Sequence, residues 1–134
     1  MGITSFDYRI LFGVSTLQPI LQIHLLGPTK SVPVDVRLDS GADMPILPQH
    51  AAEDAKLILP AHPNVWIQYG GSKVPARRIQ ATMLIGTHRF RPDVAFVEKL
   101  EFPYGLLGRI GVFSQFNEVV FLEKLANPRI ELRW

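Results

Sequence analysis

An acid, a hydroxyl and a glycine follow one another at Asp39-Ser40-Gly41, directly after a stretch that is rich in apolar residues. A carboxylate can accept or donate a proton in general acid–base chemistry. Glycine in the third position lets the backbone turn sharply and pass close to another group, because it has no Cβ atom. The same three residues are also an ordinary signal for a turn at a strand end, so the tripeptide alone leaves both interpretations open.

The residues before the acid predict the strand that positions it. Val34, Val36 and Leu38 alternate with Asp35 and Arg37. A period of two indicates a strand with one face in a core. The acid that follows is therefore aimed away from the apolar face, at the point where the strand ends.

Length and composition predict one folded domain that spans residues 1–134. A chain of 134 residues is long enough for a hydrophobic core and too short for two ordinary domains. Hydrophobic residues make up 47% and charged residues 19%, as in globular proteins. A net charge of +2 gives little reason to propose nucleic acid as a partner. The absence of cysteine excludes disulfides, thiol nucleophiles and cysteine-bound metals.

The most apolar segment, from Ile10 to Leu26, is too interrupted to predict a membrane helix, which needs about 18 or more apolar residues in a row. The interruptions are Gln18, Pro19, Gln22 and His24. The start of the chain, Met1 to Ser5, lacks the basic residues and cleavage site of a signal peptide. We therefore expect a cytoplasmic protein with no membrane partner.

Eleven prolines and ten glycines divide the sequence into short, often β-branched segments, which favours an all-β barrel or sandwich. The expected strands are Phe6 to Phe12, Ile20 to Leu26, Val32 to Leu38, a hairpin from Val65 to Val74 with its tip at Gly70-Gly71, Ile79 to Ile85, Phe90 to Val97, Val119 to Leu122 and Arg129 to Trp134.

Two short helices are also expected. The first spans Leu47 to Leu57, with Pro48 in its first position, where proline is well tolerated. The second follows from the spacing of Ile110, Phe113 and Phe116, which would lie along one side of a helix packed inward.

Other polar side chains have simpler interpretations than a binding site. His50 and Asp54 are spaced as in some metal sites, but no further histidine supports them, so we expect an exposed helix face, no metal and no cofactor. His24 is expected at the surface of its strand. The arginines at positions 77, 78, 89 and 91 are expected to form a solvated face. A groove for an anionic partner is the alternative.

Three motifs occur in a characteristic order. They are Asp39-Ser40-Gly41-Ala42-Asp43, the glycine-tipped hairpin at Gly70-Gly71, and Leu106-Leu107-Gly108-Arg109 leading into a helix. This order, from about residue 20 to about residue 120, resembles the retropepsin-like aspartic proteases. The resemblance implies an all-β acid-protease fold: a closed barrel with a flap hairpin and one or two short helices. It also implies an endopeptidase that acts on peptides or proteins.

Such an enzyme needs two carboxylates that share one proton, because two like charges at close range cannot both ionise cheaply. This chain contains one Asp-Ser-Gly. The aspartates at positions 7, 35, 54 and 93 are followed by Tyr, Val, Ala and Val, so none is equivalent. Two-fold symmetry in a homodimer can supply a second copy of Asp39, because a residue near the axis meets itself.

The resemblance also implies roles for individual residues. Asp39 would be the catalytic acid, Ser40 would brace the two active-site loops across the dimer, and Gly41 would orient the carboxylate. Ala42 and Asp43 would line the cleft and bind the substrate backbone. Tyr69, Gly70 and Gly71 of the flap would cover the substrate. Leu106, Leu107 and Gly108 would pack beneath the catalytic loop.

Some residues depart from the family pattern. Arg37 stands where relatives commonly have an apolar residue, Ser40 replaces the more frequent threonine, and Lys73 places a charge near the flap tip. The chain ends are candidates for a sheet between protomers. A catalytically silent dimerisation or peptide-binding module of the same fold is the main alternative, and a nucleic-acid-binding β-barrel is a more distant one.

Overall fold

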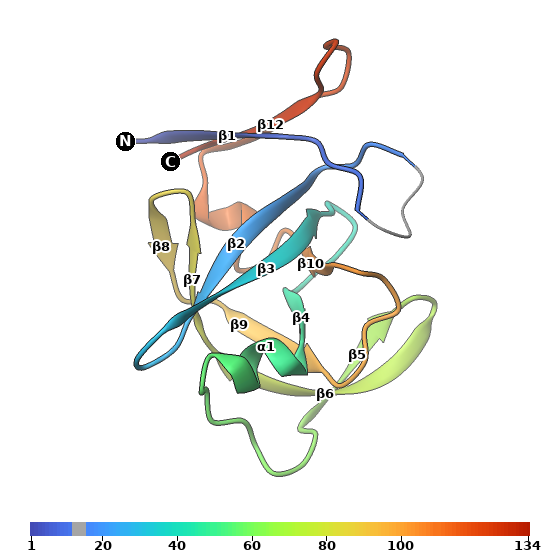
Figure 1. Ribbon diagram of the computed structural model, residues 1–134. Coiled ribbons are helices and arrows are strands. Elements are labelled where there is room, and N and C mark those ends of the chain that lie inside the picture. The colour runs from blue at the N-terminus through green and yellow to red at the C-terminus, as the bar shows by residue number, and fades with distance from the viewer. Residues whose placement is uncertain (12–15) are drawn as a thin grey trace.

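The computed structural model describes residues 1–11 and 16–134, which form mainly strands (Figure 1). The strands are β1 (Ile3–Asp7), β2 (Ile20–Leu26), β3 (Ser31–Leu38), β4 (Ile46–Pro48), β5 (Val65–Tyr69), β6 (Ser72–Gln80), β7 (Thr82–Ile85), β8 (His88–Phe90), β9 (Asp93–Val97), β10 (Gly105–Leu107), β11 (Glu118–Leu122) and β12 (Arg129–Arg133). One α-helix, α1 (Gln49–Asp54), and one 3₁₀ turn, η1 (Phe113–Gln115), complete the described elements. None of the described helices is long and apolar enough to cross a membrane.

Nine strands form one sheet in the order β5-β6-β9-β4-β10-β3-β2-β7-β8. Strand β10 lies between β3 and β4, parallel to the former and antiparallel to the latter. This insertion brings the segment around residue 106 beside β3, which ends at Leu38 directly before Asp39. The all-β prediction is confirmed, and closure of the sheet into a barrel stays a prediction.

Strand β3 has the alternation that the sequence predicts. Val34, Val36 and Leu38 are buried, with 7%, 0% and 3% of their surface exposed, whereas Asp35 and Arg37 are half-buried. Burial of each apolar side chain contributes about 1.5–3 kcal/mol. A shift of register by one residue would expose all three side chains. The register, and with it the face on which the side chains of Asp35 and Arg37 lie, is therefore firmly set.

The predicted hairpin is confirmed, with β5 and β6 joined by Gly70 and Gly71. Their φ angles are +59° and +80°. Positive φ at both positions of a two-residue loop favours glycine and matches the right-handed twist of the paired strands.

The two chain ends lie side by side in a separate three-stranded sheet, β1-β12-β11 (Figure 1). The amide N–H of Gly2 donates to the carbonyl of Trp134 at 2.7 Å. Ile130 and Leu132 of the central strand are buried in the main core. These apolar side chains of the C-terminal strand are therefore buried within the chain itself.

The prediction of a first strand from Phe6 to Phe12 is wrong. Strand β1 runs from Ile3 to Asp7, and Phe12 lies outside the described residues. The ladder with β12 ends at Asp7, after which the N–H of Tyr8 donates to the carbonyl of Pro128 at 2.9 Å. Burial, together with a hydrogen bond to Glu123, raises the pKa of Tyr8 above its ordinary range.

Both predicted helices are shorter than expected. Leu47 and Pro48 belong to β4, where they pair with β9, so α1 spans only Gln49–Asp54 and Pro48 precedes the helix. The second helix is only the 3₁₀ turn Phe113–Gln115.

Gly111, whose φ angle is +83°, interrupts the helical backbone conformation just before that turn. Ile110 is consequently 63% exposed, whereas Phe116 is buried. The predicted inward-facing stripe is therefore wrong at its first residue.

Two predicted strands are each interrupted. Ala81 separates β6 from β7 because its N–H donates to the carbonyl of Pro92 at 3.1 Å instead of continuing a ladder. Pro92 lies between β8 and β9, where it has no N–H to offer a neighbouring strand.

Candidate active site

Asp39 is the first residue after β3 and is fixed by the neighbouring β10. Its backbone N–H donates to the carbonyl of Leu107 at 2.9 Å, and its carbonyl accepts from the N–H of Ala42 at 3.1 Å. The N–H of Gly41 donates to the side-chain Oδ1 at 2.9 Å. The carboxylate is thus oriented by its own loop, while 30% of the side chain stays exposed.

Arg37 binds the other oxygen of this carboxylate. Its Nη2 donates to Oδ2 of Asp39 at 3.0 Å, and its Nη1 donates to the Tyr104 hydroxyl at 3.0 Å and to Oε1 of Gln18 at 3.3 Å. In the sequence, Arg37 is a polar residue of the alternating strand and a departure from the family pattern. The two-residue period of β3 could have predicted this contact, because Arg37 and Asp39 share one face of the strand.

The segment after Asp39 is bound to the segment after β10. The N–H groups of Arg109 and Ile110 donate to the carbonyls of Ala42 and Asp43 at 3.2 and 3.0 Å. A Cβ atom on Gly108 would collide with the Ala42 carbonyl, so this approach requires glycine. The motifs at positions 39–43 and 106–109, far apart in the sequence, are therefore side by side.

A cavity of about 360 Å³ lies between this loop and the hairpin of β5 and β6. Seven residues of the predicted site line it: Asp39, Gly41, Ala42, Asp43, Tyr69, Gly70 and Leu106. Ser40, Gly71, Leu107 and Gly108 do not line it: the first two are exposed, and the last two are buried next to the loop. Further lining residues, which the sequence analysis did not select, are Met44, Ile46, Trp66, Ile67 and Gln68.

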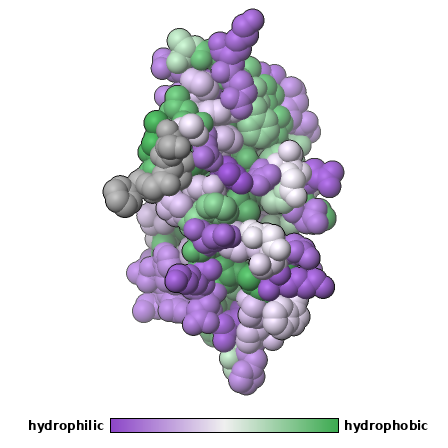
Figure 2. All heavy atoms as spheres, turned by 90° about the vertical axis from the view of Figure 1, so that its right-hand side faces the viewer, coloured by the Kyte–Doolittle hydropathy of each residue, from purple (hydrophilic) through white to green (hydrophobic). Residues whose placement is uncertain are grey.

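The hairpin and the loop after β3 both extend toward the right-hand side of Figure 1. Figure 2 shows this side of the molecule, where hydrophobic atoms emerge between hydrophilic ones along the middle of the face. Trp66 of β5 is 69% exposed although it is aromatic. Exposed aromatic side chains beside a cavity are typical of sites that bind a partner or a ligand.

The base of the hairpin tip is attached to the segment before β10. The Tyr69 hydroxyl accepts hydrogen bonds from the N–H groups of Glu101 and Phe102 at 2.9 and 3.4 Å. A side chain on Gly70 would collide with the Glu101 carboxylate. The hairpin therefore has a defined position over the cavity.

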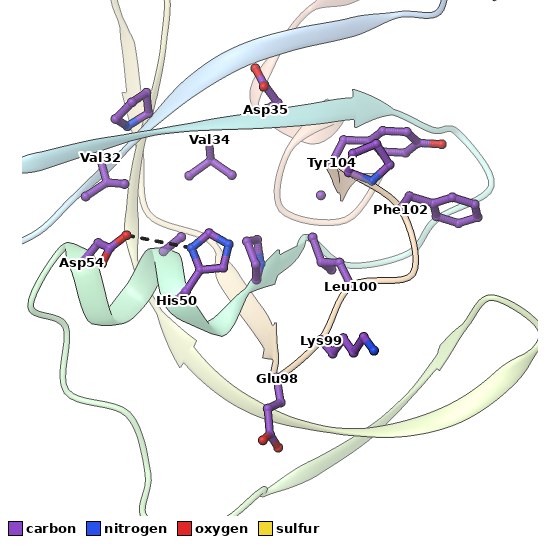
Figure 3. Close-up of a pocket in the computed structure, with 15 residues that line it drawn as sticks. Val32, Val34, Asp35, His50, Asp54, Glu98, Lys99, Leu100, Phe102 and Tyr104 are labelled. Carbon is purple, nitrogen blue, oxygen red and sulfur yellow. Dashed lines mark ion pairs between the residues drawn. The ribbon is translucent and has the colours of Figure 1, made fainter. Parts of the chain in front are cut away.

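A second hollow, of about 380 Å³, lies between β3, α1 and the segment 98–105 and does not include Asp39 (Figure 3). His50 and Asp54 form a 3.9 Å ion pair at its edge, with 75% and 63% of their side chains exposed. No group of three or more potential metal ligands occurs in the described part of the chain. The prediction of an exposed helix face at His50 and Asp54 is confirmed.

No protein-family model and no curated protein matches the sequence. Solved structures do match. A retropepsin-like aspartic protease from Rickettsia conorii is 15% identical, with a TM-score of 0.60 over 98% of this chain and 91% of its own. The EIAV protease, solved with the inhibitor HBY-793, is 20% identical, with a TM-score of 0.54 over 69% of this chain and 82% of its own.

The chain therefore has the fold of the retropepsin-like aspartic proteases. The Rickettsia conorii structure aligns with this chain almost from end to end.

Proposed function

We propose that residues 1–134 form one domain that acts as an aspartic endopeptidase, with an active site formed by Asp39 of two identical chains. One observation carries this proposal: the Asp39 carboxylate, oriented by the Gly41 N–H, lies at the wall of a cavity beneath a hairpin. A peptide substrate would occupy that cavity, extended beside the hairpin.

The need for a second chain follows from where the other aspartates lie. The aspartates at positions 7, 35, 54 and 93 do not line the cavity that contains Asp39. Asp43 shares the cavity, but it forms a 4.0 Å ion pair with Arg109. A two-fold axis next to Asp39 would bring two equivalent carboxylates together without any other acid.

Two such carboxylates would hold one proton between them. The ionised Asp39 takes a proton from a water molecule, and the resulting hydroxide attacks the scissile carbonyl carbon. The protonated Asp39 of the second protomer donates its proton to the carbonyl oxygen, giving a neutral tetrahedral diol. The first Asp39 then donates its proton to the amide nitrogen while the second accepts a proton from one hydroxyl of the diol. The C–N bond breaks, a carboxylic acid and an amine leave, and the pair again holds one proton.

The remaining predicted residues would support this chemistry. Ser40, which is exposed next to Asp39, would meet its counterpart across the axis. Ala42 and Asp43 would bind the substrate backbone, and Tyr69, Gly70 and Gly71 would cover it and exclude water. The contacts of Leu107 and Gly108 with the loop would keep Asp39 in place.

The chain-end sheet offers a surface for the second protomer. Strands β1 and β11 are its two edges among the described residues, and edge strands present backbone groups that can pair with another chain. Ile3 in β1 is 61% exposed. An interface that includes this sheet would bury apolar surface at the same time.

Replacement of Asp39 tests the reaction. Asp39→Asn should fold normally and lose at least about 10³-fold in the rate of cleavage of a denatured protein, because the amide cannot exchange the catalytic proton. Asp35→Asn is the matched control, since it removes a carboxylate from the same strand outside the cavity. Equal activity of Asp39→Asn and the wild type would refute the proposal.

The contact between Arg37 and Asp39 favours one alternative, a peptide-binding module without catalysis. In such a module the ion pair would occupy Oδ2 of Asp39 permanently. A denatured protein incubated with and without a peptidomimetic aspartic-protease inhibitor separates the two functions. Inhibitor-sensitive cleavage supports the enzyme, whereas inhibitor binding without any cleavage supports the module.

A further inference from the structure

Arg37 is a strongly polar residue in contact with the proposed catalytic acid. We propose that it selects substrates that carry an Asp or Glu side chain next to the scissile bond. This inference rests on the proposed protease function and specifies the substrate class of the same site.

The position of Arg37 follows from the strand. Arg37 and Asp39 are two residues apart in β3 and its extension, so their side chains lie on the same side. The 3.0 Å distance from Nη2 to Oδ2 confirms this. Arg37 does not itself line the cavity, but it contacts Asp39, which does. A peptide bond that Asp39 attacks would therefore lie close to the guanidinium.

The guanidinium is held in place before a substrate arrives. Its Cζ lies 5.1 Å from the centre of the Tyr104 ring, and Nη1 also bonds the Tyr104 hydroxyl. Tyr104 is only 3% exposed and stacks on Phe102, with ring centres 5.4 Å apart and an interplanar angle of 5°. Figure 3 shows these two aromatic residues on one segment, before β10. A fixed, planar donor loses little conformational entropy when it binds a carboxylate.

Arg37 retains capacity for another acceptor. A guanidinium has five N–H donors. Its hydrogen bonds to Asp39, Tyr104 and Gln18 use three of them among the residues that the structure describes. The side chain is 28% exposed, so Arg37 is partly open to solvent.

The charge of the assembled site favours an acidic side chain. In the proposed dimer the two Asp39 residues, sharing one proton, carry one negative charge, and the two Arg37 residues carry two positive charges. One positive charge therefore lacks a counter-charge next to the scissile bond, because Asp43 and Arg109 compensate each other. A substrate carboxylate would neutralise it, whereas a lysine there would be repelled.

A substrate carboxylate that bonds the remaining N–H groups would also draw the guanidinium away from Asp39. When it binds the guanidinium, Oδ2 of Asp39 loses its partner and becomes available to the attacking water. An acidic side chain should therefore raise kcat as well as lower KM, which a distant charge effect would not do.

The experiment uses pairs of peptides that differ only by Glu or Gln at one position that flanks the scissile bond. The wild-type protein should cleave the Glu peptide with kcat/KM at least about tenfold higher, as expected for a charge-assisted hydrogen bond. This preference should decrease as NaCl is increased, because salt screens partly exposed charges. A Glu to Gln ratio near one in the wild type overturns the inference, whatever the variants do.

Variants then assign the preference to Arg37. Arg37→Lys should keep the direction of the Glu preference, and Arg37→Glu should replace it with a preference for Lys over Gln. Arg78→Gln removes an arginine that is paired with Asp93 outside the cavity, so its ratio should equal that of the wild type. An undiminished Glu preference in well-folded Arg37→Glu would also overturn the inference.

Failure of the inference differs visibly from failure of the proposed function. If the wild type cleaves peptides without regard to Glu or Gln, the enzyme stands and the selectivity does not. If the wild type cleaves no peptide of either kind and no denatured protein, both are refuted.

Discussion

The hydroxyl of Tyr69 accepts a hydrogen bond from the backbone N–H of Glu101 at 2.9 Å, which joins the end of β5 to the segment that leads into β10. Tyr69 is 6% exposed and lies beside the cavity that contains Asp39. The hairpin over the site is thus positioned by a contact with the same segment that carries Tyr104, the partner of Arg37.

Removal of the Tyr69 hydroxyl should loosen the hairpin. We expect Tyr69→Phe to lower the free energy of unfolding by about 1 kcal/mol and to raise KM by up to about tenfold, because substrate binding must then order the hairpin. Thermal unfolding and peptide cleavage measure the two effects. Tyr8→Phe, which loses a hydrogen bond to Glu123 away from the cavity, should lower stability without changing KM. An unchanged KM for Tyr69→Phe would contradict the role of this contact.

Gly108 should tolerate no side chain. Gly108→Ala places a methyl group against the Ala42 carbonyl, and we expect a loss of about 1–3 kcal/mol of stability together with reduced cleavage, because the loop at 39–43 must move. Gly71→Ala is the comparison: its Cβ meets no atom within 4 Å, so only its φ of +80° carries a cost, about 1–2 kcal/mol. Denaturant unfolding measures both variants. Full stability of Gly108→Ala would show that the two segments separate easily.

A shared active site should make the inactive chain a dominant inhibitor. Asp39→Asn mixed in excess with the wild type should reduce cleavage well beyond simple dilution, because most wild-type chains would pair with a chain that lacks the second acid. Asp35→Asn mixed in the same way should not reduce it. Sedimentation velocity checks that the chains exchange. An unaffected rate in exchanged mixtures would show that one chain is active alone.

The chain-end sheet should be sensitive to acid. A hydrogen bond from Arg133, and to a smaller extent one from Arg129, lowers the pKa of Glu131 below its ordinary value of 4.5. A carboxyl whose pKa is depressed in the folded state stabilises the fold above its unfolded pKa, and this contribution is lost as the pH falls through the folded value. Melting temperature should therefore fall as the pH drops below about 4.5.

A matched pair of variants assigns this effect. Glu131→Gln should flatten the acid side of the stability profile, whereas Glu98→Gln, at an exposed residue without an ion pair in the described structure, should leave it unchanged. Identical profiles for the wild type and Glu131→Gln would exclude Glu131 as the cause.

Local patterns in the sequence were sufficient to predict several elements. The alternation from Val34 to Leu38 predicted β3 and the direction of the acid that follows it, because a side chain's face in a strand depends only on whether its position is odd or even. Gly70-Gly71 predicted the hairpin tip for a similarly local reason, since both residues have positive φ. The motif order also predicted the fold that the solved structures share.

Elements whose limits depend on a partner strand were not predictable in the same way. Leu47 and Pro48 follow a helical pattern, yet pairing with β9 keeps them extended. The apolar spacing of Ile110 and Phe113 suggested a helix, but Gly111 between them has a positive φ angle that interrupts it, and Ile110 is exposed. Pairing with a distant strand offers hydrogen bonds that compete with weak local propensity.

The sequence by itself determined which residue is the candidate acid, that it follows directly on a strand, and that no second Asp-Ser-Gly accompanies it. Only the tertiary structure decided which distant residues surround that acid: Leu107 on its backbone, Tyr104 as the second partner of Arg37, and the Tyr69 hairpin across the cavity. The physical reason is range. The alternation in a strand predicts which of its own side chains are buried. Contacts such as that of Arg37 with Tyr104 form only when β10 is inserted beside β3.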